Sequence, residues 1–195
     1  MKVKKKIILA SASPRRQILL QQIGFDFEIR HSSVEEVFDK TKTPEENVIR
    51  LAEAKALDIA KDIEHAFIIG ADTIVVMNGE MMGKPADDGD AFRMLKKLSG
   101  REHKVFTGFA IVDKPSNKIV SNVEITSVKF RDLEDEEILE YVKSKSPTDK
   151  AGAYGIQDDY GAVFVERING CFYNVVGFPL TKFYITLQKF QKEIA

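Results

Sequence analysis

The chain has 195 residues, of which 44% are hydrophobic and 30% are charged, which is typical of a globular protein with a sizeable core. Its net charge of −1 provides no general attraction to nucleic acid or to an anionic membrane, so any anion must be bound locally. The single cysteine, Cys171, excludes a disulfide within the chain and indicates a reducing cytoplasm. The apolar run after the basic start MKVKKK is too short for a signal sequence or a membrane span, so we expect neither.

The first part of the chain alternates short apolar segments with amphipathic ones. This pattern predicts strands at 6–10 and 25–33, and helices at 14–23 and from Pro44 to about residue 61. The second helix has a threonine cap, a proline at its first position and acids in its first turn.

The rest of the chain adds long hairpins to further helices. We expect hairpins around Asn78-Gly79, around KPSN at 114–117 and around Asn169-Gly170. Helices are expected at 87–98, from Asp132 to about Ser144, and after Pro179. A glycine-rich loop, DKAGAYGIQ, covers residues 149–157. Hairpins mixed with helices predict an α/β protein whose sheet is mixed and not purely parallel.

Two arginines stand in the first turn of the first predicted helix, at the positive end of the helix dipole. Arg15 and Arg16 each cost roughly 0.3–1 kcal/mol there unless an anion compensates. They lie one turn before Leu19 and Leu20, so they tend to point with the buried face. With Ser11 and the helix N–H groups, they form a candidate anion site. The alternative is that the arginines swing out or pair with an acid elsewhere.

Two further charges interrupt apolar patterns. Lys55 falls within the apolar stripe of the second helix, so it must either extend to solvent or meet a buried anion. Asp72 interrupts the run AFIIGADTIVVM, where a carboxylate needs a cation or hydrogen-bond donors. Asp72 is therefore either a structural salt-bridge partner or a metal ligand or general base. The acids of Val34-Glu35-Glu36 could join it around Mg²⁺, the alternative being that this pair is solvated surface.

The hairpin around Asn78-Gly79 is expected to fold Lys84 back towards Asp72. Tyr154 and Gln157 of the glycine-rich loop could meet a flat ring. The alternative is that residues 149–157 form an ordinary surface loop. The arginines and lysines could bind phosphates, and the carboxylates could hold a metal. Together these groups indicate a metal-dependent phosphate site. The sequence has no P-loop motif.

Several long blocks resemble the Maf family, in the family's order, over about residues 7–181: LASASPRRQILL, VEE, LAEAKA, GADTIVVMNGEMMGKP, LSGREHKVFTG and DKAGAYGIQ…INGCFYNVVGFPL. The resemblance implies a nucleoside triphosphate pyrophosphatase that cleaves between the α and β phosphates, giving a monophosphate and diphosphate. It also implies one Maf-like domain over residues 1–195, with an elongated mixed sheet, flanking helices and two lobes around a cleft. This fold is similar to that of the inosine triphosphatase group, and homodimers are expected.

The resemblance also implies roles for individual residues. Asp72 would be the proton acceptor, and with Glu36 it would hold Mg²⁺ or Mn²⁺. Lys84 is implied as a second catalytic group in the cleft. The implied substrate-binding residues are Ser11, Arg15, Arg16, Lys55, Thr73 and Gln157, of which Arg15, Thr73 and Gln157 would influence the choice of substrate.

The forms SPRR, GADT and AGAYGIQ are similar to the branch of the family that acts on dTTP and UTP. We therefore expect a cytoplasmic pyrimidine triphosphate pyrophosphatase with no nucleic acid polymer or membrane as partner. Two alternatives are open: a purine or 7-methyl-GTP pyrophosphatase, or a non-catalytic nucleotide-binding regulator of cell division. The carboxylates favour an enzyme, because simple anion binding needs none.

Overall fold

The computed structural model describes residues 3, 5–157 and 159–194. By their internal contacts, the residues form two compact units. The first unit comprises residues 1–72, 107–124 and 177–195, and the second comprises 73–106 and 125–176. The expected single domain with a cleft between two lobes stays a prediction.

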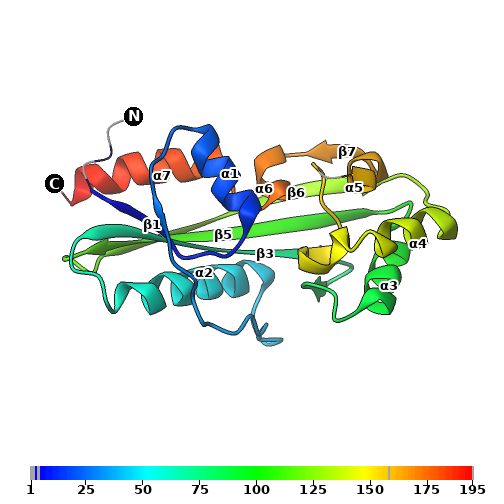
Figure 1. The fold of residues 1–195 in the computed structure, drawn as a ribbon, viewed down its shortest axis with the longest axis horizontal. Helices are drawn as coiled ribbons and strands as arrows, with labels where there is room; N and C mark the ends of the chain where they lie inside the picture. Colours follow the sequence, from blue (N-terminus) through cyan, green and yellow to red (C-terminus); the bar gives the residue numbers. More distant parts are fainter. Residues whose placement is uncertain (1–2, 4, 158, 195) are drawn as a thin grey trace. The chain divides into compact units, whose positions relative to one another are not determined.

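Among the described residues, seven strands form one mixed sheet in the order β2-β1-β3-β5-β6-β7, with β4 paired to β3 (Figure 1). β1 runs parallel to β2 and β3, whereas β4 and β7 are antiparallel to their partners, which confirms the predicted mixed sheet. The strands are β1 (Ile7–Leu9), β2 (Glu28–Ile29), β3 (Ala66–Met77), β4 (Glu80–Met82), β5 (Glu102–Lys114), β6 (Ile119–Phe130) and β7 (Val165–Asn169).

The helices follow the sequence signals most closely where caps are strong. Thr43 forms a reciprocal capping box with Glu46 at the start of the second helix, and Asp87 caps the third. The helices are α1 (Pro14–Gln22), α2 (Pro44–Ala60), α3 (Asp88–Leu98), α4 (Asp135–Lys143), α5 (Asp159–Phe164), α6 (Phe172–Val176) and α7 (Leu180–Glu193). Two 3₁₀ turns follow α4: η1 (Ser146–Asp149) leads into the glycine-rich loop, and η2 (Ala151–Ala153) lies within it.

In the first unit, α2 and α7 cover opposite faces of the sheet (Figure 1). Gly70 of β3 and Gly108 of β5 lie against the backbone of α2, where a Cβ at Gly70 would be 2.1 Å from the Ala52 oxygen. Phe109 follows Gly108 and therefore points to the other face, where its ring centroid is 5.7 Å from that of Phe183 in α7. The two glycines thus let α2 lie directly on the sheet.

The core of the second unit surrounds a buried histidine. His103 of β5 is 2% exposed, and its ring centroid is 5.0 Å from that of Phe130 in β6. Its Nε2 lies 2.8 Å from the hydroxyl oxygen of Tyr154, while its buried Nδ1 has no hydrogen-bond partner among the described residues. Burial lowers the pKa of His103 to about 4, because the apolar surroundings disfavour the imidazolium.

We expect the buried histidine to make the fold sensitive to acid. The unfolded chain binds a proton at His103 below about pH 6.5, whereas the folded chain does not until about pH 4, so acidification favours unfolding. Between pH 7.5 and 5.0 this amounts to about 2 kcal/mol. Urea unfolding measures the free energy of unfolding at both pH values. Its decrease on acidification should be smaller in His103→Gln than in the parent, by about this amount. His65→Gln, at an exposed position, should follow the parent, and parallel curves for His103→Gln and the parent would contradict the prediction.

Three predicted elements differ from the structure. The strand expected over 25–33 is reduced to β2, which covers Glu28–Ile29. The helix expected from Asp132 begins at Asp135, because Glu134 and Glu137 form the capping box instead. The hairpin expected around Asn169-Gly170 does not form, since α6 covers Phe172–Val176 and β7 pairs with β6.

Tertiary hydrogen bonds explain the last of these differences. The buried side chain of Asn174 donates to the Val105 carbonyl at 3.0 Å and to the Thr126 hydroxyl at 2.9 Å. The Thr126 hydroxyl also accepts from the backbone N–H of Cys171 at 3.0 Å. These contacts hold the segment after Gly170 as a helix, and local strand patterning does not encode them.

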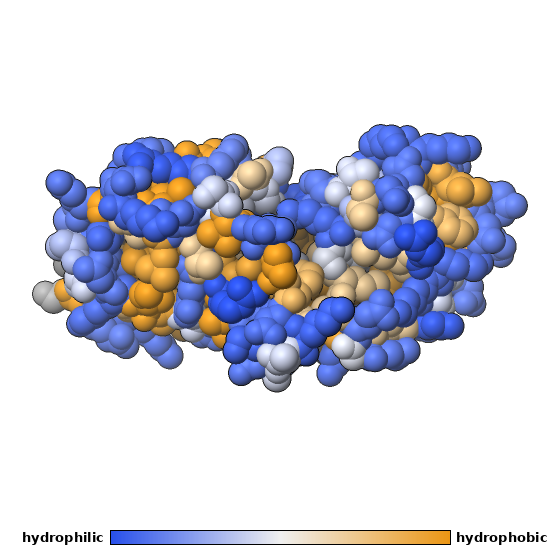
Figure 2. All heavy atoms as spheres, turned by 90° about the horizontal axis from the view of Figure 1, so that it is seen from below, coloured by the Kyte–Doolittle hydropathy of each residue, from blue (hydrophilic) through white to orange (hydrophobic). Residues whose placement is uncertain are grey.

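The side of the molecule on which α2 lies shows hydrophilic side chains around patches of hydrophobic ones (Figure 2). The exposed large apolar residues include Val37 at 56% and Leu57 of α2 at 43%. Within the described residues, every helix is too short or too polar to cross a membrane.

Candidate functional site

The turn between β1 and α1 places Arg16 in a buried position. Its Nε donates to the Gly177 carbonyl at 2.9 Å, and its Nη1 donates to the Ser11 hydroxyl at 3.2 Å. Ser11 is 6% exposed and also accepts from the backbone N–H of Ser13 at 3.2 Å. The sequence did not point to Gly177, because no local signal connects two residues that are 161 positions apart.

The guanidinium of Arg16 is influenced by two acids. Burial lowers the pKa of Arg16, while the negative charges of Asp72 and Glu36 oppose this change. Arg15, the preceding residue of α1, is only half-buried. The predicted anion-binding turn thus has one buried and one more accessible arginine, and α1 has no acid in its first turn. Whether the two arginines bind phosphate stays a prediction.

Lys55 of α2 joins the two predicted metal ligands. Its Nζ donates to Asp72 Oδ1 at 2.6 Å and to Glu36 Oε1 at 2.7 Å. The side chains of Lys55 and Asp72 are 7% and 5% exposed, whereas that of Glu36 is 36% exposed. Of the two alternatives for Lys55, the structure therefore shows contact with a buried carboxylate and not extension to solvent. The helix and strand meet here because Gly70, two residues before Asp72 on the same face of β3, lies against the backbone of α2.

The second oxygen of Asp72 has no such partner. Its Oδ2 is buried and makes no hydrogen bond to any described residue. Burial raises the pKa of Asp72, while Lys55 and Arg16 oppose the rise. A buried carboxylate oxygen without a partner is costly, so a native site that retains one is suited to a ligand such as a water molecule or a cation.

The donor set fits a hard divalent cation. Mg²⁺ is commonly held by one or two carboxylates together with substrate phosphates, and Asp72 and Glu36 provide two carboxylates around one lysine. The described residues include no group of three or more His, Cys, Asp or Glu side chains placed to hold a metal by themselves. The chemistry of the site therefore fits a cation that is shared with a phosphate ligand.

The other predicted residues belong to the second unit. Thr73 follows Asp72 in β3, so its side chain points to the opposite face of the sheet. Lys84 and Gln157 are both exposed. The backbone N–H of Gly152 donates to the Gly83 carbonyl at 3.0 Å, which brings the glycine-rich loop beside the segment that carries Lys84. The contribution of these three residues to a common site stays a prediction.

Two buried hydroxyls hold this glycine-rich loop. Tyr154 contacts His103 as described, and the backbone N–H of Gly155 donates to the Tyr141 hydroxyl at 3.3 Å. Burial raises the pKa of Tyr154, which keeps its hydroxyl protonated. The expectation that Tyr154 meets a ligand's flat ring is therefore wrong, because Tyr154 is 5% exposed and packs in the core as an anchor of the loop, whereas the role of Gln157 stays a prediction.

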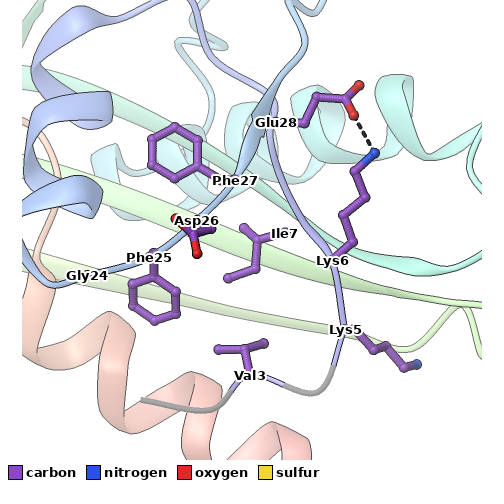
Figure 3. A pocket seen from close by; sticks show the side chains of 9 residues that line it. All are labelled: Val3, Lys5, Lys6, Ile7, Gly24, Phe25, Asp26, Phe27 and Glu28. Carbon is purple, nitrogen blue, oxygen red and sulfur yellow. Dashed lines mark ion pairs between the residues drawn. The ribbon is translucent and has the colours of Figure 1, made fainter.

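A separate hollow of about 650 Å³ lies beside β1 and β2 (Figure 3). Phe25 and Phe27 contribute apolar side chains, and Lys6 reaches Glu28 in an ion pair (Figure 3). None of the nine lining residues is a predicted site residue. The hollow is therefore distinct from the candidate site; its lining is Val3, Lys5, Lys6, Ile7, Gly24, Phe25, Asp26, Phe27 and Glu28.

Known proteins resemble this chain over almost its whole length. The model of the Maf-like protein family matches residues 6–190. A dTTP/UTP pyrophosphatase of Caldicellulosiruptor bescii is 47% identical over 95% of this chain and 94% of its own. A dTTP/UTP pyrophosphatase of Acetivibrio thermocellus is 50% identical over 95% of each chain. A solved structure of a HAM1 protein from Coxiella burnetii has a TM-score of 0.51 at 16% identity, covering 95% of this chain and 99% of that chain. This last likeness concerns the fold alone and supports the predicted α/β fold class.

Proposed function

This chain belongs to the Maf family, and we propose that it is a nucleoside triphosphate pyrophosphatase that hydrolyses dTTP and UTP. Cleavage between the α and β phosphates would give a nucleoside monophosphate and diphosphate. The observation that carries the proposal is the buried carboxylate of Asp72, which has one oxygen paired with Lys55 and the other without a hydrogen-bond partner. A site for simple anion binding has no need of such a carboxylate.

We assign Asp72 the role of general base. Its raised pKa makes the carboxylate a better proton acceptor than an exposed aspartate, and its second oxygen is available to an attacking water. Lys55 fixes the orientation of the carboxylate through the bond at 2.6 Å. The water oxygen would attack the α-phosphorus as a proton of the water passes to Asp72. The bond from that phosphorus to the α–β bridging oxygen would break, and diphosphate would leave.

The phosphates would be bound by the turn at the start of α1. Arg16 and Ser11 are already held together, and the N-terminus of the helix adds N–H groups and a favourable dipole. Arg15 is the more accessible of the two arginines, and we propose that it contacts the substrate and contributes to its selection. Lys84 would neutralise further phosphate charge.

Asp72 and Glu36 would hold Mg²⁺ or Mn²⁺. When bound, such a cation neutralises phosphate charge and lowers the pKa of a bound water. We propose that Thr73 and Gln157 contribute to the choice of base. The amide of Gln157 offers both a donor and an acceptor, which suits the edge of a pyrimidine. A cytoplasmic homodimer, with no nucleic acid polymer or membrane as partner, completes the proposal.

A panel of triphosphates tests the substrate and the reaction. The purified chain is incubated with dTTP, UTP, CTP, GTP and 7-methyl-GTP in the presence of Mg²⁺ or Mn²⁺, and the products are separated by chromatography. We expect monophosphate and diphosphate from dTTP and UTP in preference to the others. A preference for 7-methyl-GTP or a purine would contradict the substrate, and the absence of products from all five would favour a binding protein.

A further inference from the structure

The segment that carries Glu36 has no regular structure of its own. Residues 30–43 connect β2 to α2 without a helix or strand. The position of the Glu36 carboxylate therefore depends on what holds this segment from outside. The contacts with α2 provide such support at both ends of the segment.

Asp58, near the end of α2, holds the part of the segment that precedes Glu36. Its Oδ2 accepts from the Ser32 hydroxyl at 3.0 Å, from the Ser33 backbone N–H at 3.0 Å and from the Ser33 hydroxyl at 3.2 Å. The Ser32 hydroxyl in turn accepts from the backbone N–H of Val34 at 3.2 Å. One carboxylate oxygen thus fixes the backbone immediately before VEE.

Asn47, near the start of α2, holds the part that follows Glu36. Its side-chain oxygen accepts from the Asp39 N–H at 2.8 Å, and its Nδ2 donates to the Asp39 carbonyl at 2.9 Å. Asn47 is fully buried, so this two-way bond to the backbone is shielded from water. Arg50, one turn later, donates from Nη2 to the Val37 carbonyl at 2.5 Å.

Lys55 lies between these two attachments on α2 and contacts Glu36 itself at 2.7 Å. A single helix therefore holds the backbone on both sides of Glu36 and its carboxylate in the middle. We propose that Asp58 and Asn47 are positioning residues that fix Glu36 for metal binding. This inference rests on the proposed function, since it takes Glu36 as a metal ligand.

The experiment measures binding of Mn²⁺ in the presence of a saturating non-hydrolysable analogue of dTTP, whose phosphates share the ion. The electron paramagnetic resonance signal of the free ion is recorded, and the signal of Mn²⁺ with the analogue and no protein is the blank. Asp58→Ala is expected to raise the Kd for Mn²⁺ about tenfold, the effect typical of losing support behind a metal ligand. Asp58→Asn keeps an oxygen for the Ser33 N–H and should recover most of the affinity. Lys61→Ala is the matched control, because it removes the ion pair of Asp58 at 3.0 Å but leaves the serine contacts in place.

Asn47→Ser loosens the other attachment and should weaken Mn²⁺ binding in the same direction. Thermal unfolding checks that each variant is folded. If Asp58→Ala does not fold, a double variant with Ser32→Ala and Ser33→Ala removes two of the same hydrogen bonds and is expected to weaken binding likewise. Unchanged Mn²⁺ affinity in the folded Asp58 or Asn47 variants would overturn the inference for that residue.

A double-mutant cycle separates this inference from the proposed function. In a Glu36→Gln background, Asp58→Ala should cause no further loss of Mn²⁺ affinity, because its effect passes through Glu36. A full additional loss would show that Asp58 acts by another route and would overturn the positioning role alone. If Glu36→Gln itself leaves Mn²⁺ affinity unchanged, the metal role of Glu36 in the proposed function is wrong, and the inference falls with it.

Discussion

Replacing Asp72 by Asn is expected to lower kcat for dTTP by about two to four orders of magnitude. The amide has nearly the same shape as the carboxylate and keeps an oxygen for Lys55, but it cannot accept a proton from water. Substrate binding should change much less than turnover, because the arginines of α1 remain. Initial rates over a range of dTTP and Mn²⁺ concentrations measure both effects.

The stability of the Asp72→Asn variant is the control for this experiment. Lys55 keeps the carboxylate of Glu36 at 2.7 Å when Asp72 loses its charge, so it is not left buried without an opposite charge, and we expect the protein to remain folded in thermal unfolding. Turnover near that of the parent in a folded variant would contradict the role of Asp72 as the base. Loss of folding would instead mean that the ion pair with Lys55 is mainly structural.

Replacing Gly70 by Ala is expected to lower the free energy of unfolding by about 3 kcal/mol or more, which is a severe case of overpacking. The added Cβ would lie 2.1 Å from the Ala52 oxygen and 2.8 Å from the Ala56 nitrogen. Both are backbone atoms of α2, so no side chain can move aside, and the helix itself must shift. Because α2 carries Lys55, activity should fall together with stability.

Gly89→Ala is the matched control for this prediction. Gly89 lies in the first turn of α3, and an added Cβ there meets the Asp87 side chain at 3.2 Å. Alanine also favours a helix over glycine by about 1 kcal/mol, so the control should change stability little or increase it. Urea unfolding of both variants provides the measurement. A Gly70→Ala variant as stable as the parent would show that α2 is not in close contact with β3.

The sequence predicted those parts of the fold that local signals determine. The capping box at Thr43, the cap at Asp87 and the turn at Asn78-Gly79 each satisfy nearby backbone groups, so they are visible in a short window. The segment after Gly170 was predicted wrongly as a strand, because its helix depends on Asn174 reaching Val105. Hydrogen bonds between distant segments leave no periodic pattern.

Some residues of the candidate site could also be predicted from local patterns, and others could not. Lys55 and Asp72 were recognisable because each is a charge within an apolar pattern, and the structure pairs them at 2.6 Å. No sequence pattern distinguishes Asn47 and Asp58, since polar residues are common on helices and their partners lie outside the helix. The roles of Thr73, Lys84 and Gln157 remain predictions that rest on the family resemblance and the expected hairpin.

The ion pairs of Lys55 influence whether the site binds a free nucleotide or a nucleotide–metal complex. With both carboxyls ionised, Asp72 and Glu36 carry two negative charges, and Lys55 and Arg16 carry two positive ones. These four groups are therefore electrically balanced at rest, and they offer little attraction to a bare polyanion. A nucleotide that brings its own cation supplies positive and negative charge together, so this arrangement favours the nucleotide–metal complex over the free triphosphate.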